Sequence, residues 1–359
     1  MSPKKKTLRE EGQDFQDDQS LLVLAMDRYE DDRLLEAARL LRRVSDPDLL
    51  RSHPYTEILG KARRCENLVS NLCSPIDGNG KDDGDRDGDE DEGSEWTKQG
   101  ECHGNRDTAI YYKMDKETNT KLTARLETPI ESTLLVPLLS VLNESDLYAT
   151  WFPRWTSPMR LGVTGSEKLQ QNGRVNQTIL VSVDMPWPLS AREVVINALA
   201  CDDIDSNGHI ALTLQTLEAG EEIGTIGEGP KVVPPPRKGS VRLDFDGGFL
   251  FRPCPPDHPT LKGSVEGGLN ETELQTDLLL VSFSMFIDTK ISFLPTSVIN
   301  FVVRTVIGRI WDMFLKVAED VREGKRPKHR AAIEKKRRTL FDWVEERVQV
   351  MLRIVQQQG

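Results

Sequence analysis

The sequence lacks most of the patterns that carry enzyme chemistry or metal binding. Its five cysteines include no CxxC pair, and none of its five histidines has the spacing of a zinc ligand set. No glycine-rich phosphate loop and no Ser/His/Asp or Cys/His order occurs along the 359 residues. These absences argue against nucleotide-dependent, metal-dependent and triad chemistry. We therefore expect no cofactor and no enzymatic activity.

Long apolar runs are missing as well. No segment approaches the roughly 20 apolar residues that span a bilayer, and the basic start MSPKKKTLREEGQDF has no apolar core of the kind found in a secretory signal. The odd number of cysteines favours reduced thiols, as in a cytosolic protein. The net charge of −11 argues against nucleic acid as the main partner. The expected protein is soluble and cytoplasmic, with peripheral association with membranes.

Composition divides the chain into five parts. Residues 1–53 hold a polar tail and a helical segment, and residues 54–75 predict a helix that belongs with the main folded region. Residues 76–95 form an acidic insertion, residues 96–321 the main region, and residues 322–359 a basic amphipathic tail.

The acidic stretch 77–95 contains ten acidic and two basic residues. Asp83, Asp85, Asp87 and Gly88 match the first, third, fifth and sixth positions of an EF-hand loop. The twelfth position should be a bidentate glutamate, but Ser94 stands there. The sequence therefore predicts a mobile, solvated linker that binds no calcium tightly.

The main region begins with strand patterns. Apolar residues alternate with polar ones around Ile110–Met114 and again around Leu122–Leu126, which predicts a hairpin. A helix is expected from about Pro137, because proline suits the first turn. Later strands are predicted around residues 175–185, 210–214, 241–245 and 278–287, with a tight turn at Gly247-Gly248.

A proline-flanked tryptophan, Met185-Pro186-Trp187-Pro188-Leu189, follows the strand at 175–185. Neither proline can donate to a β-ladder, so the strand must turn sharply. Ser190 and Glu193 then match a capping box, which predicts that a helix begins at this corner.

The longest predicted helix follows Pro295 and covers residues 298–321, a length of roughly 36 Å. Its apolar stripe includes Ile299, Val303, Val306 and Ile310, and further apolar residues widen the stripe beyond one-sided packing. A mostly antiparallel sheet followed by one broad apolar helix predicts an α+β architecture, with the helix lying across the sheet.

Taken in order, several segments resemble a START lipid-binding domain of the helix-grip class. They are TAIYYKM, LLSVLNESDLYATWFPRW, VDMPWPLSAREVV, VRLDFDGGFLFRP, LLLVSFSMFID and LPTSVINFVVRTVIG. The resemblance covers roughly residues 96–321, with helix 56–73 as the family's first helix. One departure is Glu193, where the family commonly has aspartate.

The resemblance implies a curved antiparallel sheet wrapped around a long C-terminal helix, with additional N-terminal helices. The fold would enclose a tunnel for one lipid. Family members bind sterols, phospholipids or sphingolipids, so the implied partners are such a lipid and, transiently, a membrane surface. The implied function is non-enzymatic lipid binding with intermembrane transfer or sensing.

The apolar phase of each element predicts which side chains line the tunnel. They are Val181, Val183, Leu212, Leu214, Leu243, Phe245, Phe283, Met285, Ile299, Val303, Val306 and Ile310. Phe293 and Leu294 precede Pro295 and have no place on the inner stripe of the helix. We expect them to contact the bilayer while the helix acts as a lid, with ordinary core packing as the alternative.

The tail has two interpretations. Residues 322–338 carry nine Lys/Arg and two Glu, and Leu340, Phe341, Val344 and Val348 continue as an apolar stripe. This combination suits an anionic membrane surface, but it also suits a helix docked on the domain or paired with the acidic insertion.

Two other functions stay open at this stage. The protein could be an adaptor that uses a START-like fold without a ligand, which an occluded cavity would favour. It could also be a small-molecule enzyme of the polyketide-cyclase type, which a histidine or carboxylate cluster facing the tunnel would favour.

Overall fold

The computed structural model describes residues 17–76, 96–103, 107–114, 121–156, 160–185, 187, 189–226, 229–261, 278–288, 290 and 306–358. The chain forms two compact units, Met1–Arg63 and Arg64–Gly359. The division falls within helix α3 (Tyr55–Cys73). The acidic stretch 77–95 and residues 291–305 lie outside the described residues, together with the expectations that concern them.

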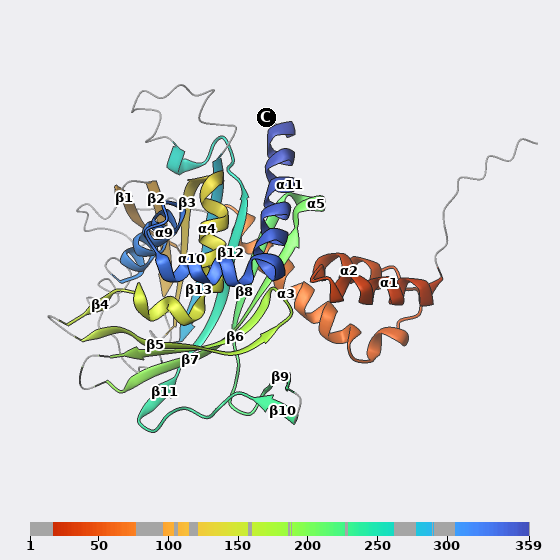
Figure 1. The fold of residues 1–359 in the computed structure, drawn as a ribbon, viewed down its shortest axis with the longest axis horizontal. Helices are drawn as coiled ribbons and strands as arrows, with labels where there is room; N and C mark the ends of the chain where they lie inside the picture. The colour runs from red at the N-terminus through yellow and green to blue at the C-terminus, as the bar shows by residue number, and fades with distance from the viewer. Residues whose placement is uncertain are drawn as a thin grey trace, which may run out of the picture. The chain divides into compact units, whose positions relative to one another are not determined.

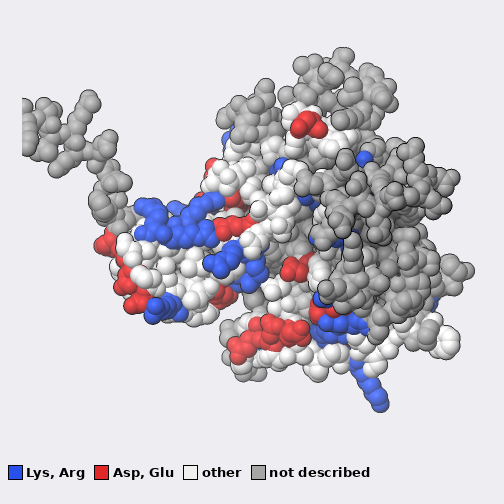
Figure 2. Space-filling view, turned by 180° about the vertical axis from the view of Figure 1, so that it is seen from behind, with Lys and Arg blue, Asp and Glu red and all other residues white. Residues whose placement is uncertain are grey.

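The first unit is a small helical bundle. Helices α1 (Asp18–Glu30) and α2 (Leu34–Leu41) are separated at Asp32, whose φ of 63° cannot continue a helix. A 3-10 turn, η1 (Leu49–Arg51), leads into α3. The Asp18 carboxylate accepts hydrogen bonds from the backbone N–H groups of Ser45 (2.9 Å) and Asp46 (3.0 Å). Basic and acidic side chains lie together on the face of this unit shown in Figure 2.

The second unit is built on one large sheet. Within the described residues, its strands are β1 (Thr97–His103), β2 (Asp107–Met114), β3 (Lys121–Glu131), β4 (Arg154–Trp155), β5 (Leu161–Asn172), β6 (Asn176–Asp184), β7 (Ala191–Asp203), β8 (His209–Thr216), β11 (Ser240–Arg242), β12 (Asp244–Pro253) and β13 (Leu278–Asp288). A separate two-stranded ribbon pairs β9 (Glu222–Ile226) with β10 (Gly229–Val232).

The strand order is β1-β2-β3-β13-β12-β8-β7-β6-β5-β4, and β11 pairs with β7. Neighbours in this order are antiparallel, whereas the β11–β7 pair is parallel. The predicted hairpin is confirmed as β2 and β3, and the apolar run at 278–287 is confirmed as the strand β13 inside the sheet.

Helices cover one face of this sheet (Figure 1). They are α4 (Leu135–Asn143), α9 (Gly308–Arg322), α10 (Pro327–Lys336) and α11 (Asp342–Gln358), accompanied by η3 (Ser145–Thr150), α5 (Ile204–Asn207) and a π-helical turn at Arg337–Phe341. Their inner residues share one core with the strands, including Leu138, Trp311, Val317, Met351 and Phe251. The predicted α+β helix-grip class, with N-terminal helices, is therefore confirmed. No helix among the described residues has both the length and the apolarity needed to cross a membrane.

The helix predicted after the Pro-Trp-Pro corner is wrong. Residues 191–203 form strand β7, which pairs with β6 on one side and with β8 and β11 on the other. The Glu193 carboxylate caps no helix and accepts a hydrogen bond from the backbone N–H of Arg237 (3.1 Å). The ladder hydrogen bonds and the β-branched Val194 and Val195 outweigh the local capping signal. The corner joins two antiparallel strands and leaves Trp187 93% exposed.

The tight turn predicted at Gly247-Gly248 is also wrong, because both glycines lie inside β12. Their φ angles are 151° and 156°, which residues with a Cβ rarely adopt. A Cβ at either position would lie 2.0 Å from a backbone oxygen of a neighbouring strand, that of Ser284 or Leu212. Glycine here permits a kinked strand and close backbone approach, which is how sheets acquire curvature.

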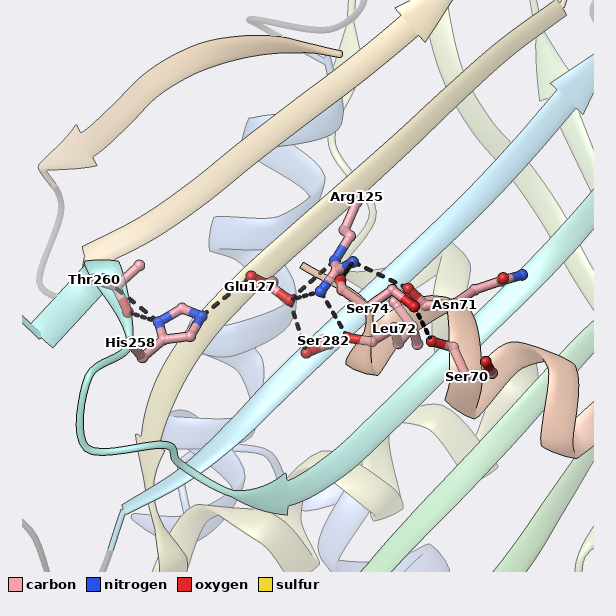
Figure 3. A network of polar contacts seen from close by, with 9 residues as sticks. All are labelled: Ser70, Asn71, Leu72, Ser74, Arg125, Glu127, His258, Thr260 and Ser282. Atoms are coloured by element: carbon pink, nitrogen blue, oxygen red, sulfur yellow. Dashed lines mark hydrogen bonds and ion pairs between the residues drawn. The ribbon is translucent and has the colours of Figure 1, made fainter. Parts of the chain in front are cut away.

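A buried polar network ties the end of α3 to the outer face of the sheet (Figure 3). The Arg125 guanidinium donates to the carbonyl oxygens of Asn71 (3.1 Å), Leu72 (2.6 Å) and Ser74 (2.8 Å). These are carbonyls at the end of the helix, which lack partners within it. The same guanidinium donates to Glu127 Oε1 at 2.6 Å.

Glu127 extends the network across the sheet. Its Oε2 lies 3.1 Å from His258 Nε2, and His258 Nδ1 lies 2.6 Å from Thr260 Oγ1. Burial alone would raise the pKa of Glu127, but the hydrogen bond from His258 and the charge of Arg125 hold that pKa below its ordinary value. The carboxylate is therefore ionised and paired at neutral pH.

We predict that Arg125→Met lowers the free energy of unfolding of the second unit by roughly 3–5 kcal/mol, because it leaves the Glu127 carboxylate buried and unpaired. Adding Glu127→Gln should recover part of that loss. Denaturant unfolding followed by near-UV circular dichroism measures both effects. Arg154→Met, at an exposed arginine, is the control and should change stability by less than about 0.5 kcal/mol. Equal stability of Arg125→Met and the wild type would contradict this role of the network.

Candidate functional site

A cavity of about 470 Å³ lies between the inner face of the sheet and the helices that cover it. This volume is within the range of roughly 300–1,000 Å³ that is typical of small-molecule sites. Its wall is mostly apolar and comes from β3, β5–β8, β12, β13, α4, α9 and the C-terminal helices. A single molecule of predominantly apolar character matches such a wall.

Ten of the side chains predicted to line a tunnel lie in this wall. They are Val181, Val183, Leu212, Leu214, Leu243, Phe245, Phe283, Met285, Val306 and Ile310. The other two, Ile299 and Val303, lie outside the described residues, as do Phe293 and Leu294. The placement of the ten does not show what they bind, and their contact with a lipid stays a prediction.

The pleat of the strands explains why these residues share one surface. Val181 and Val183 are two residues apart on β6, and Leu212 and Leu214 are two apart on β8, so each pair points to the same face. Polar neighbours such as Ser182 and Thr213 point to the other face. This alternation can be read from the sequence, so these positions were predictable.

An aromatic cluster forms part of the cavity wall and also belongs to the core. The ring of Phe249 lies 4.4 Å from that of Phe283 and 5.7 Å from that of Phe314, measured between centroids. Trp311 Nε1 donates a hydrogen bond to Thr128 Oγ1 (2.8 Å), which fixes the indole on α9. These fixed rings give one end of the wall a rigid, apolar surface.

The C-terminal tail also supplies part of the wall, a role that its sequence did not predict. Leu340, Phe341, Trp343, Val344 and Arg347 all line the cavity. The apolar stripe at 340–348 was the signal, but it did not distinguish docking on the domain from contact with a membrane. The structure shows the docked arrangement, in which Val348 and Met351 are buried in the core.

Charged groups hold the tail in place at one end of the cavity. The Arg347 guanidinium contacts the Asp202 carboxylate and lies 2.8 Å from Asp205 Oδ2. Burial alone would lower the pKa of Arg347, but the hydrogen bonds and charges of Asp202 and Asp205 raise it, so the pair is ionised. Lys336 Nζ lies 2.7 Å and 2.8 Å from the two oxygens of Glu144.

Lys168 lies beside the Lys336–Glu144 pair. Burial and the nearby charge of Lys336 lower the pKa of Lys168 to about 8, although Glu144 and Asp146 partly offset them. A lysine whose pKa is lowered in the folded state makes folding more favourable as the pH rises from about 8 towards its ordinary value. At neutral pH the charged form of Lys168 is therefore disfavoured at this site, chiefly by its burial and secondly by the charge of Lys336.

The described part of the cavity wall offers no arrangement typical of a catalytic centre. The His258–Glu127 pair belongs to the network on the outer face of the sheet, and neither residue lines the cavity. No group of three or more His, Cys, Asp or Glu residues that could hold a metal ion occurs among the described residues.

The order of elements now decides the type of fold. Helix α3 precedes three antiparallel strands, and the helical segments η2 (Ser132–Leu134), α4 and η3 lead into the remaining strands. Helix α9, which α10 and α11 follow, covers the sheet over a cavity. The fold is START-like.

No family model and no curated protein sequence matches the chain. Among solved structures, the chain is similar to human STARD10, with 13% identity, a TM-score of 0.47, and coverage of 73% of this chain and 81% of that one. It is also similar to human StAR-related lipid transfer protein 5, with 16% identity, a TM-score of 0.45, and coverage of 73% and 98%.

A third similar structure is a fragment of a STAR-related lipid transfer protein from Xanthomonas axonopodis. Its identity is 17% and its TM-score 0.42, with coverage of 62% of this chain and 99% of that chain. These likenesses concern the fold alone.

Proposed function

We propose that the protein binds one lipid in its cavity, without chemical conversion, and carries or senses that lipid between membranes. The single observation that carries the proposal is the apolar cavity of about 470 Å³ inside an otherwise packed domain. Native interiors rarely leave such space unfilled, because each lost contact costs stability. A cavity of this size lined by side chains such as Val183, Leu214 and Phe245 is best explained by an apolar occupant.

The ten lining residues named above are the proposed lipid contacts. They cover opposite sides of the cavity, from β6 and β8 on the sheet to Val306 and Ile310 beside and within α9. Burying apolar surface of a ligand against such a wall contributes about 25 cal/mol per Å². The wall therefore provides affinity through area and shape, whereas the identity of the lipid depends on details of fit.

The two alternatives have less support. An occluded cavity would favour a ligand-free adaptor, but the described cavity is open enough to hold a molecule. A catalytic cluster facing the cavity would favour an enzyme, and the buried histidine–carboxylate pair lies on the other side of the sheet. Of the three functions, non-enzymatic lipid binding is the one that the apolar wall of the cavity favours.

We predict that Val181→Trp abolishes lipid uptake, because the indole projects into the cavity and occupies the space of the ligand. The wild type and the variant are incubated with vesicles of a natural lipid extract, separated from them, and examined by mass spectrometry for bound lipid. Ser182→Trp, at the next residue of β6 and on the opposite face, is the matched control and should retain lipid.

Thermal unfolding provides the check on folding. Because the new side chain fills existing space, Val181→Trp should melt within a few degrees of the wild type. If the folded Val181→Trp protein carried as much lipid as the wild type, the cavity would not be the binding site.

We also propose that Phe293 and Leu294 contact the membrane during exchange, a proposal that rests on the sequence because both residues lie outside the described part. Replacing both with aspartate should slow lipid exchange between vesicles at least tenfold, since carboxylates are excluded from the hydrocarbon boundary. Replacing both with alanine gives a milder control. Exchange at the wild-type rate by a folded double-aspartate variant would refute the membrane contact.

A further inference from the structure

The C-terminal segment 327–358 closes part of the cavity, and ion pairs help to hold it there. Leu340, Phe341 and Val344 face the cavity, so the wall is incomplete without them. Figure 1 shows α10 lying across the helices in front of the sheet and α11 rising beside α5. A molecule that enters or leaves on this side must displace this segment.

Two basic side chains of the segment form ion pairs with the rest of the domain. Arg347 reaches Asp202 and Asp205, and Lys336 reaches Glu144. The Asp202 and Glu144 side chains are only 6% and 9% exposed, whereas Lys336 is 28% exposed. The cationic partner at the second contact is thus accessible to a competing anion from solvent.

The outer surface of the first part of this segment, residues 327–338, is basic. Lys328, Arg330, Lys335 and Arg338 are exposed, and none of the four makes an ion pair or side-chain hydrogen bond with another described residue. This cationic surface belongs to a chain whose net charge is −11, so it is a local feature and not a consequence of composition. Because these four side chains have no acidic partner within the described residues, they leave a local positive surface that can attract an anionic one.

We propose that residues 327–358 are a lid on the cavity and that an anionic lipid bilayer is the partner that opens it. The proposal rests on the proposed lipid-binding function, and it adds the surface and the partner that control access to the site. Each basic residue near an anionic membrane strengthens the attraction by about fivefold, equivalent to about 1 kcal/mol. Phosphate groups also compete with Glu144 and Asp202 for the cations that hold the lid.

The apolar face of α11 explains why a bilayer fits better than another polyanion. Opening the lid exposes Val344, Val348 and Met351, which are at least partly buried in the closed arrangement. An amphipathic helix can bury such a face at the headgroup boundary of a bilayer. A nucleic acid or an acidic protein segment would attract the basic residues but would leave the apolar face in water.

The test compares vesicles of pure phosphatidylcholine with vesicles containing about one-third phosphatidylserine. A variant with Lys328, Arg330, Lys335 and Arg338 all replaced by glutamine should bind the anionic vesicles at least 100-fold more weakly than the wild type in sedimentation. Its uptake of lipid from those vesicles should slow at least tenfold. Uptake from neutral vesicles should match the wild type, because these exposed side chains touch neither the cavity nor the core.

A second variant acts in the opposite direction. Asp202→Asn combined with Arg347→Gln removes one fastening without leaving a buried charge unpaired. It should take up lipid from neutral vesicles several-fold faster than the wild type. Circular dichroism of both variants verifies that they are folded.

The outcomes separate this proposal from the lipid-binding function. A folded quadruple variant that binds anionic vesicles and takes up lipid from them at the wild-type rate would overturn the lid proposal alone. Wild-type binding to RNA as strong as its binding to anionic vesicles would overturn the choice of partner. If the wild type acquired no lipid from either type of vesicle, the proposed function itself would fail.

Discussion

The structure depends on the bend of one strand, β12, inside the sheet that its helices cover. The bend in β12 at Gly247 and Gly248 requires backbone angles that only glycine adopts easily, and the neighbouring carbonyls leave no room for a side chain. Because β12 lies between β13 and β8, the bend affects strands on both sides. The apolar inner face of this sheet contacts α9 through Trp311, and beside these contacts the cavity lies between the sheet and the helices.

The two faces of the sheet differ in chemistry. The outer face carries the Arg125–Glu127–His258 network, in which each charge has a partner, so it fixes the end of α3. The inner face has apolar side chains whose contacts are incomplete along the cavity. Specific polar contacts thus hold α3 on the outer face of the sheet, while the apolar inner surface along the cavity is available to a ligand. The C-terminal segment completes that surface, but polar contacts such as Lys336–Glu144 help to hold it.

Ten residues of the cavity wall could be predicted because they follow from alternation along strands and from helical periodicity, whereas the helix-grip class came from the resemblance of several segments to a known family. A residue on β6 or β8 faces inward or outward according to its parity, so Val181 and Leu214 could be placed without knowledge of tertiary contacts. The helix predicted after β6 was wrong for the opposite reason. Ser190 and Glu193 carry a genuine local helix signal, but pairing with distant strands decides the conformation of β7. The Gly247-Gly248 pair likewise predicts a turn, and only the pairing of β12 with its neighbouring strands shows that both glycines lie inside a strand.

The tail shows a different limit of sequence analysis. Its basic and apolar stripes suit both a docked helix and a membrane-bound one, because the same amphipathic pattern serves either surface. The structure shows docking through Arg347 and Phe341, and this arrangement makes the tail part of the cavity. Composition alone does not indicate which carboxylates Arg347 meets, because Asp202 and Asp205 are more than 140 residues away in the chain.

Native mass spectrometry of the full chain, purified gently from the cells that express it, measures whether the cavity holds one lipid. We predict a complex of one protein with one lipid, which dissociates on collisional activation to release a molecule identifiable in the lipid extract. A spectrum containing only the bare chain, before and after incubation with lipid vesicles, would contradict it.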